Sequence, residues 1–177
     1  MRSMVFTLFT CVLLAAPARA QFVPPPPAPE AEAAVEEVSL SGPRFGFTHL
    51  SDGVVKQLRD NYYITVGSVV TQFGWQFERH LYSNGNITAL TEWIVLVGGL
   101  EQGTALPSGS WLVGLRARNG FEVGVGPNLT PAGPALAIAA GVTFGMGGLK
   151  VPVNVAVVPS RNGARVSFLT GFNTRRN

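Results

Sequence analysis

Residues 110–128 read SWLVGLRARNGFEVGVGPN, and this stretch predicts a β-hairpin. Apolar residues alternate with small or polar ones on both sides of the turn at 118–120, as they do in strands with two different faces. A three-residue turn with Gly120 in the left-handed conformation sets Arg116 opposite Glu122. One face of the hairpin is therefore apolar, and the other combines glycines with an ion pair.

Three other predicted turns extend this two-faced pattern along the chain. Gly147-Gly148, as a two-residue turn, sets Phe144 opposite Val151 on the apolar face. Asn162-Gly163 and the loop at 83–85 are predicted to fix the register of two further hairpins in the same way. The other pairs that these turns predict are Gly145 with Lys150, Val157 with Phe168, Trp75 with Trp93, and Gln76 with Glu92.

Short runs of period-two alternation between turn residues predict eight strands in all. They span residues 44–50, 69–82, 86–99, 110–117, 121–128, 136–146, 149–158 and 164–173. A helical turn is expected at 52–59, with Ser51 as its N-cap. The connections at 83–85, 118–120 and 147–148 are tight, whereas those at 51–68, 100–109 and 129–135 are longer, and Trp111 is expected near the long-loop end. This alternation is typical of outer-membrane barrels with short periplasmic turns.

The polar face of these strands is a poor match for a surface in water. Only 13% of the residues are charged, against about 25% in soluble domains, and 21 residues are glycine. The interior of an eight-stranded barrel is narrow and must be filled by side chains. We therefore expect the glycine-rich face to line the interior and the apolar face to contact lipid. The predicted fold is all-β, an eight-stranded antiparallel up-and-down transmembrane β-barrel.

The predicted interior contains a small set of polar side chains. Because Arg116 lies opposite Glu122, we expect a structural ion pair rather than paired catalytic carboxylates. His80 is expected to point inward beside Glu78. The predicted network of interior polar residues consists of Gln76, Glu78, Glu92, Arg116, Glu122 and Lys150.

The N-terminal residues predict export. Arg2, the apolar stretch at 4–16 and the small residues around Ala20 have the arrangement of a signal peptide, which we assign to residues 1–20. Residues 21–43 are rich in proline, alanine and glutamate and predict a periplasmic linker. The barrel domain is assigned to 44–177. Cys11, the only cysteine, lies within the signal, so the mature chain has neither disulfides nor cysteine-based metal sites.

The stretches RFGF at 44–47 and FLTGF at 168–172 resemble those of the small outer-membrane β-barrel proteins of Gram-negative bacteria. The segment at 72–78 is similar to those of uncharacterised members with no assigned activity. The resemblance implies an outer-membrane location, contact with membrane lipid and delivery by the barrel-assembly machinery. Members of this family usually end in an aromatic residue, whereas here NTRRN follows Phe172.

The sequence predicts no catalytic site, metal site or cofactor, and the net charge of +3 is too small to indicate a nucleic-acid partner. The first functional hypothesis is a structural or surface-interaction role, with a ligand bound through the loops at 51–68 and 100–109. A narrow channel for small or apolar molecules is the second. A lipid-directed hydrolase that uses His49, Ser51 and Asp52 is the third. A soluble periplasmic barrel that binds an apolar ligand is the structural rival.

Overall fold

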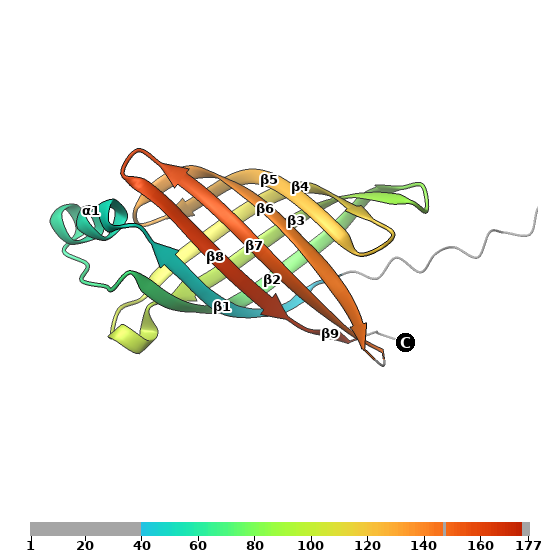
Figure 1. Ribbon diagram of the computed structural model, residues 1–177, viewed down its shortest axis with the longest axis horizontal. Coiled ribbons are helices and arrows are strands. Elements are labelled where there is room, and N and C mark those ends of the chain that lie inside the picture. The colour runs from blue at the N-terminus through green and yellow to red at the C-terminus, as the bar shows by residue number, and fades with distance from the viewer. Residues whose placement is uncertain (1–39, 147, 175–177) are drawn as a thin grey trace, which may run out of the picture. The chain divides into compact units, whose positions relative to one another are not determined.

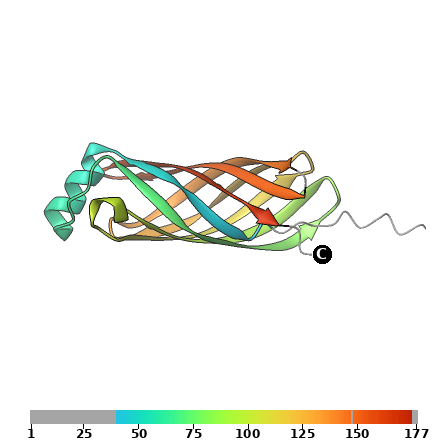
Figure 2. The ribbon, with the colours of Figure 1, turned by 90° about the horizontal axis from the view of Figure 1, so that it is seen from below.

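The computed structural model describes residues 40–146 and 148–174, which form a closed antiparallel barrel of eight strands with one short helix (Figures 1 and 2). Each strand pairs with its neighbours in sequence, and β1 pairs with β8 to close the barrel. The strands are β1 (Gly42–Leu50), β2 (Val69–Ser83), β3 (Ile87–Gly98), β4 (Leu106–Ala117), β5 (Phe121–Thr130), β6 (Gly133–Met146), β7 (Leu149–Ser160) and β8 (Gly163–Gly171). The eight-stranded up-and-down prediction is confirmed.

Three shorter elements complete the described chain. Helix α1 (Asp52–Tyr62) and the 3-10 turn η1 (Leu100–Gln102) lie in the first and third connections, and β9 (Asn173–Thr174) adds two residues beside the start of β7. The predicted signal peptide, and the linker up to residue 39, lie outside the described residues. The first strand begins at Gly42, within the predicted linker.

Two of the predicted hairpin registers are confirmed. Arg116 lies opposite Glu122, and Gly120 adopts the left-handed φ of 86° that the three-residue turn requires. Phe144 lies opposite Val151, as the Gly147-Gly148 turn predicts. In both hairpins, glycines determine the position of the turn, so the register follows from the sequence.

The other two predicted registers are wrong by two residues. Trp75 lies opposite Val95 rather than Trp93, because the Asn84 carboxamide accepts hydrogen bonds from two later backbone N–H groups and the strand has a bulge between His80 and Tyr82. Phe168 lies opposite Val155 rather than Val157, because the last turn falls one residue earlier. A shift of two residues leaves the side chains on their predicted faces, except at the bulge, where Leu81 and Tyr82 are both exposed.

At the α1 end, the first connection spans residues 51–68 as predicted, but the third and fifth connections are shorter than predicted. Strands β5 and β6 stay paired as far as Thr130 and Gly133, so the fifth connection is a two-residue turn rather than a loop over 129–135. Strand β4 begins at Leu106, so part of the predicted loop at 100–109 is strand. Trp111 consequently lies midway along β4, where its ring stacks on that of Trp93 at 5.2 Å, and not near the end of the barrel.

The two faces of the barrel differ as predicted from the alternation. Arg44, Gln76, Glu92, Glu122, Asn128 and Arg165 are buried in the interior. Large apolar side chains are exposed on the outside, and the most exposed of those within strands include Phe73, Phe77, Trp93, Val95, Leu129, Leu136 and Ile138. The barrel thus has charged groups inside and an apolar surface outside.

Helix α1 covers one end of the barrel, as Figures 1 and 2 show. Its buried residues Val54 and Leu58 pack with Leu50, Val70 and Leu106 at the ends of three strands. Ser51 is the N-cap residue, as predicted. Its hydroxyl, however, accepts a hydrogen bond from the Ala164 N–H at 3.0 Å instead of capping the helix.

Two inward-facing glycines on β5 provide a matched test of the interior packing. A Cβ at Gly126 would lie 1.9 Å from the Trp111 carbonyl oxygen, whereas a Cβ at Gly124 would make ordinary contacts at 3.6 Å. We expect Gly126→Ala to lower the free energy of unfolding by about 1–3 kcal/mol, because a rigid backbone must shift. Gly124→Ala should change it by less than about 0.5 kcal/mol. Urea titration of the two variants makes the comparison, and equal losses would contradict it.

Candidate functional site: the polar interior of the barrel

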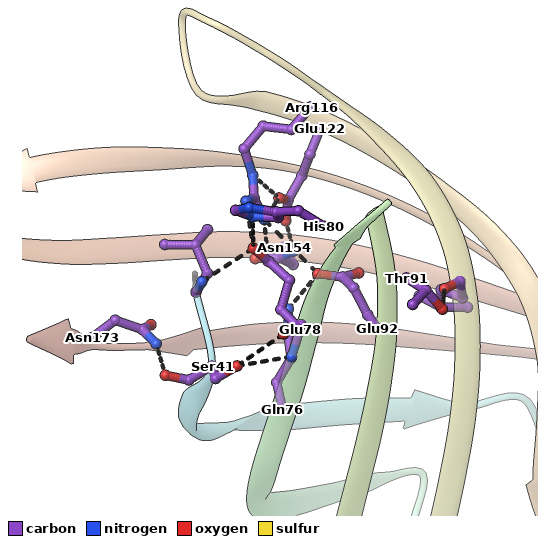
Figure 3. Close-up of polar contacts among 12 residues, drawn as sticks. Ser41, Gln76, Glu78, His80, Thr91, Glu92, Arg116, Glu122, Asn154 and Asn173 are labelled. Carbon is purple, nitrogen blue, oxygen red and sulfur yellow. Dashed lines mark hydrogen bonds and ion pairs between the residues drawn. The ribbon is translucent and has the colours of Figure 1, made fainter. Parts of the chain in front are cut away.

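Period-two alternation directs the predicted polar residues inward from β2, β3, β4 and β5. Glu78 and Glu92 face each other across the β2–β3 pair, and Arg116 faces Glu122 across the β4–β5 pair. Because β3 also pairs with β4, the two pairs lie on four consecutive strands, and curvature of the closed sheet brings their side chains together in the interior (Figure 3). Of the six residues in the predicted network, the structure brings together all except Lys150.

Arg116 is the centre of this network. Its Nη1 lies 2.7 Å from Glu78 Oε1, and its Nε lies 2.9 Å from Glu122 Oε2. Its Nη2 donates to both carboxylates, at 2.7 Å for Glu122. Glu92 is the third carboxylate, at 4.0 Å from the same nitrogen. One guanidinium therefore connects strands that do not neighbour each other in the sheet, which is the strong, geometrically specific form of ion pairing.

Arg44, on β1, is a second buried cation that the sequence analysis did not include. Its guanidinium donates to Gln76 Oε1 at 2.9 Å, and the Gln76 amide in turn donates to Glu92. A further donor of Arg44 reaches Asn173 Oδ1 at 3.3 Å. The inward position of Arg44 could have been predicted from the sequence, because Arg44 is two residues from the inward-facing Gly46 and so lies on the same face of the strand.

Two more polar side chains complete the network. Asn154, on β7, donates to Glu122 Oε1 at 2.5 Å, and His80 Nε2 lies 2.8 Å from Glu78 Oε1. The Leu40 N–H donates to Glu78 at 3.2 Å, so the backbone just before β1 also contacts the network. Glu78 and Glu122 are each held by several donors, and Glu92 accepts from the Gln76 amide, which favours a rigid structural role over a reactive one.

Lys150 lies apart from this cluster, at the tight-turn end of the barrel. With His80, Thr143 and Arg118 it lines a cavity of about 320 Å³ that opens at that end. Among the described residues, no ion pair of Lys150 is found. Lys150 is therefore placed at the mouth of the barrel and not in the ion-paired cluster.

The residues of the hydrolase hypothesis do not form a triad in this structure. His49 is exposed on the outer face of β1, together with Phe47. The Ser51 hydroxyl is bonded to the Ala164 N–H, and Asp52 begins helix α1. A nucleophile needs a base within hydrogen-bond reach, and within the described residues no hydrogen bond links His49 to Ser51.

A second polar group, also absent from the sequence analysis, lies toward the α1 end. The Asn128 carboxamide donates to Ser108 Oγ at 3.1 Å and to Ser110 Oγ at 2.9 Å. Its oxygen accepts a hydrogen bond from Arg165 at 3.1 Å, and Arg165 also donates to Thr130. The barrel interior therefore contains two polar clusters. Both follow the inward phase of the alternation.

The two loops proposed to bind a surface ligand lie side by side. Gly67 N–H donates to the Gln102 side chain at 2.6 Å, and Gln102 donates to the Val69 carbonyl at 2.8 Å. Glu101 accepts a hydrogen bond from the Thr71 N–H at 2.9 Å. The hydrogen bonds from the Thr71 hydroxyl and N–H lower the pKa of Glu101 from 4.5 to about 2.

This contact predicts how the loop responds to acid. Because the pKa of Glu101 is lowered by folding, its stabilising contribution is complete above pH 4.5 and is lost as the pH falls through about 2. Thr71→Val removes the hydroxyl donor and keeps the N–H, so the Glu101 pKa should rise back toward its ordinary value. An NMR titration of the Glu101 carboxyl in both proteins measures this. An unchanged titration midpoint of Glu101 in Thr71→Val would show that the Thr71 hydroxyl does not contribute to the lowered pKa.

These features define a class of protein: a closed eight-stranded β-barrel with an ion-paired interior, an apolar exterior and a helix over one end. A scan against protein-family models and searches of curated proteins and of solved structures find no match. Among the described residues, no group of three or more histidine, cysteine or acidic side chains is arranged to hold a metal ion. No helix in the described ranges is long and apolar enough to cross a membrane.

Proposed function

We propose that this protein is an outer-membrane β-barrel with a structural or surface-interaction role. The observation that carries the proposal is the distribution of polarity between the two faces of the sheet. On the outer face, the exposed phenylalanine, tryptophan, valine and isoleucine side chains in the strands have 38–56% of their surface accessible, while arginine and glutamate are buried inside. A soluble barrel has the opposite distribution, because burial of apolar area stabilises a fold in water.

The extent of the apolar exterior also supports a membrane location. Soluble monomers expose contiguous apolar patches of about 300–600 Å² at most, and larger ones mark protein or membrane contact. Here apolar rows continue around the barrel, for example from Val113 to Val125 and Ile138 on neighbouring strands. The described barrel closes on itself, so lipid is the partner that would cover all of these rows at once.

Strand length matches the thickness of a bilayer. Transmembrane strands need about 9–11 residues when tilted by about 45°. The eight barrel strands, β1 to β8, contain between 9 and 15 residues each. Arg79, which faces outward, lies toward the end of β2, where a long cation can extend to the headgroups.

The interior favours a structural role over a conduit. The Arg116 network crosses the barrel, and α1 closes the other end with Val54 and Leu58. The cavity between the two polar clusters has a volume of only about 50 Å³. On this proposal the α1 end faces outward, so α1 and the joined loops at 51–68 and 100–109 are the surface offered to a ligand.

The test is envelope fractionation combined with gel mobility of unheated and heated samples. We expect the protein in the outer-membrane fraction, with a band that changes mobility on heating in detergent, because a closed barrel resists unfolding until it is heated. A freely water-soluble monomer would contradict the proposal and favour the soluble ligand-binding barrel. Ion conductance in planar bilayers would favour the channel. If cells with the unaltered protein contain modified lipid species and cells with His49→Ala do not, the result would favour the hydrolase.

A further inference from the structure

Arg165 is a buried cation at the α1 end of the barrel. It lies near the start of β8, next to the last turn. Its side chain points inward, and only 7% of the residue's surface is exposed. The guanidinium donates to the Thr130 hydroxyl and to Asn128 Oδ1. Both partners are neutral, whereas Arg116 at the other end is paired with carboxylates.

The charge of Arg165 is uncompensated within the described residues. No carboxylate of residues 40–146 and 148–174 forms an ion pair with it. A guanidinium has five N–H donors, and two of its three nitrogens make the hydrogen bonds described above. A buried charge without a counter-ion is strongly unfavourable, so the site gains free energy when an anion arrives.

A cavity adjoins this guanidinium. It has a volume of about 50 Å³. One water needs roughly 10–15 Å³ by this kind of measure, so the cavity holds a group of several heavy atoms. Apolar residues make up much of its wall, among them Leu50, Val54, Leu58, Val70, Leu106 and Val158. Hydroxyl and carboxamide side chains, among them Thr48, Gln72, Thr130 and Ser167, make up the rest beside Arg165.

We infer that this cavity binds a small anion that has an apolar group, namely a short-chain monocarboxylate. The planar fork of an arginine matches the two oxygens of a carboxylate, and the apolar wall accommodates the alkyl part. Inorganic phosphate has no alkyl part to contact the apolar side chains of the wall, so it gains less free energy in this cavity than a monocarboxylate of similar size. Val54 and Leu58 of α1 form part of the wall, so the helix that covers the barrel also borders the site.

The experiment is isothermal titration calorimetry of the purified full-length mature protein in detergent, with butyrate as the probe. Butyramide, which has nearly the same shape without the charge, and inorganic phosphate are the comparison ligands. We expect butyrate to bind at least tenfold more tightly than either of them. Equal affinity for butyramide would overturn the role of Arg165, and equal affinity for phosphate would overturn the role of the apolar wall.

Two variants locate the site. Arg165→Met keeps a long apolar side chain without the charge and should weaken butyrate binding at least tenfold. Arg161→Met, at an exposed arginine in the adjacent turn, should leave it unchanged. Full butyrate affinity in Arg165→Met would overturn the inference. If that variant does not fold, the comparison of butyrate with butyramide on the unaltered protein still decides it. Neither result depends on where the barrel resides, so the outcome is separate from that of the proposed membrane location.

Discussion

Arg116→Met is expected to lower the free energy of unfolding by about 3–5 kcal/mol, because it leaves buried carboxylates without their cation. Glu78 and Glu122 are both bonded to this guanidinium, and their side chains are 0% and 6% exposed. Methionine fills a similar volume, so the loss reports the missing charge rather than a cavity. Urea titration of the refolded protein, followed by tryptophan fluorescence, measures the change.

Two further variants distinguish this network from a general effect of losing an arginine. Arg118→Met removes an exposed cation from the neighbouring turn and should change stability by less than about 0.5 kcal/mol. Adding Glu78→Gln and Glu122→Gln to Arg116→Met should recover part of the loss, because the interior then has fewer unpaired negative charges. A loss below about 1 kcal/mol for Arg116→Met alone would show that the network does not stabilise the barrel.

The faces of the strands were predictable from sequence, whereas two of the four hairpin registers were not. Period-two alternation is local, so it assigns each side chain to a face whatever the turn does. Register depends on the turn, and at 118–120 the left-handed Gly120, with the Asn119 side chain accepting from the Phe121 N–H, forms the predicted three-residue turn. In the second hairpin, the Asn84 side chain and the bulge after His80 contribute as well, and neither has a clear sequence signal.

Most members of the network were predicted from the alternation, but individual contacts were predictable only where the two residues share a strand pair. Arg116 and Glu122 lie opposite each other on adjacent strands, so the hairpin register brings them together. The contact between Arg116 and Glu78 joins β4 to β2, and it depends on how the closed sheet curves. Arg44 and Arg165 were omitted although they lie in the inward phase, because no residue across a predicted turn indicated a partner for them.

The helix in the first connection shows a different limit. A helical turn at 52–59 was predicted, and α1 continues to Tyr62. Its apolar stripe of Val54 and Leu58 could equally have faced lipid, a partner or the barrel. Only the closed barrel shows that these residues pack against strand ends and wall the cavity beside Arg165.

If lipid surrounds the barrel, Val125→Arg is expected to lower the free energy of unfolding by an amount comparable to that for Arg116→Met. Val125 lies near the middle of β5, is 47% exposed, and faces outward between Val113 and Ile138. An arginine at the bilayer midplane costs a transmembrane barrel about 2–4 kcal/mol, and less toward the interfaces. On a barrel surrounded by water, an exposed valine replaced by arginine changes stability by less than about 0.5 kcal/mol. The two environments therefore predict clearly different values for one substitution.

The control variant introduces the same charged side chain at a different depth relative to the bilayer. Asn162→Arg places the same side chain in the exposed turn between β7 and β8, where it contacts headgroups or water in either environment. Unfolding in lipid vesicles should show a loss for Val125→Arg and almost none for Asn162→Arg. The ratio of the two losses tests the environment directly, because both variants retain the interior network. If Val125→Arg is as stable as the unaltered protein, the apolar rows do not contact hydrocarbon.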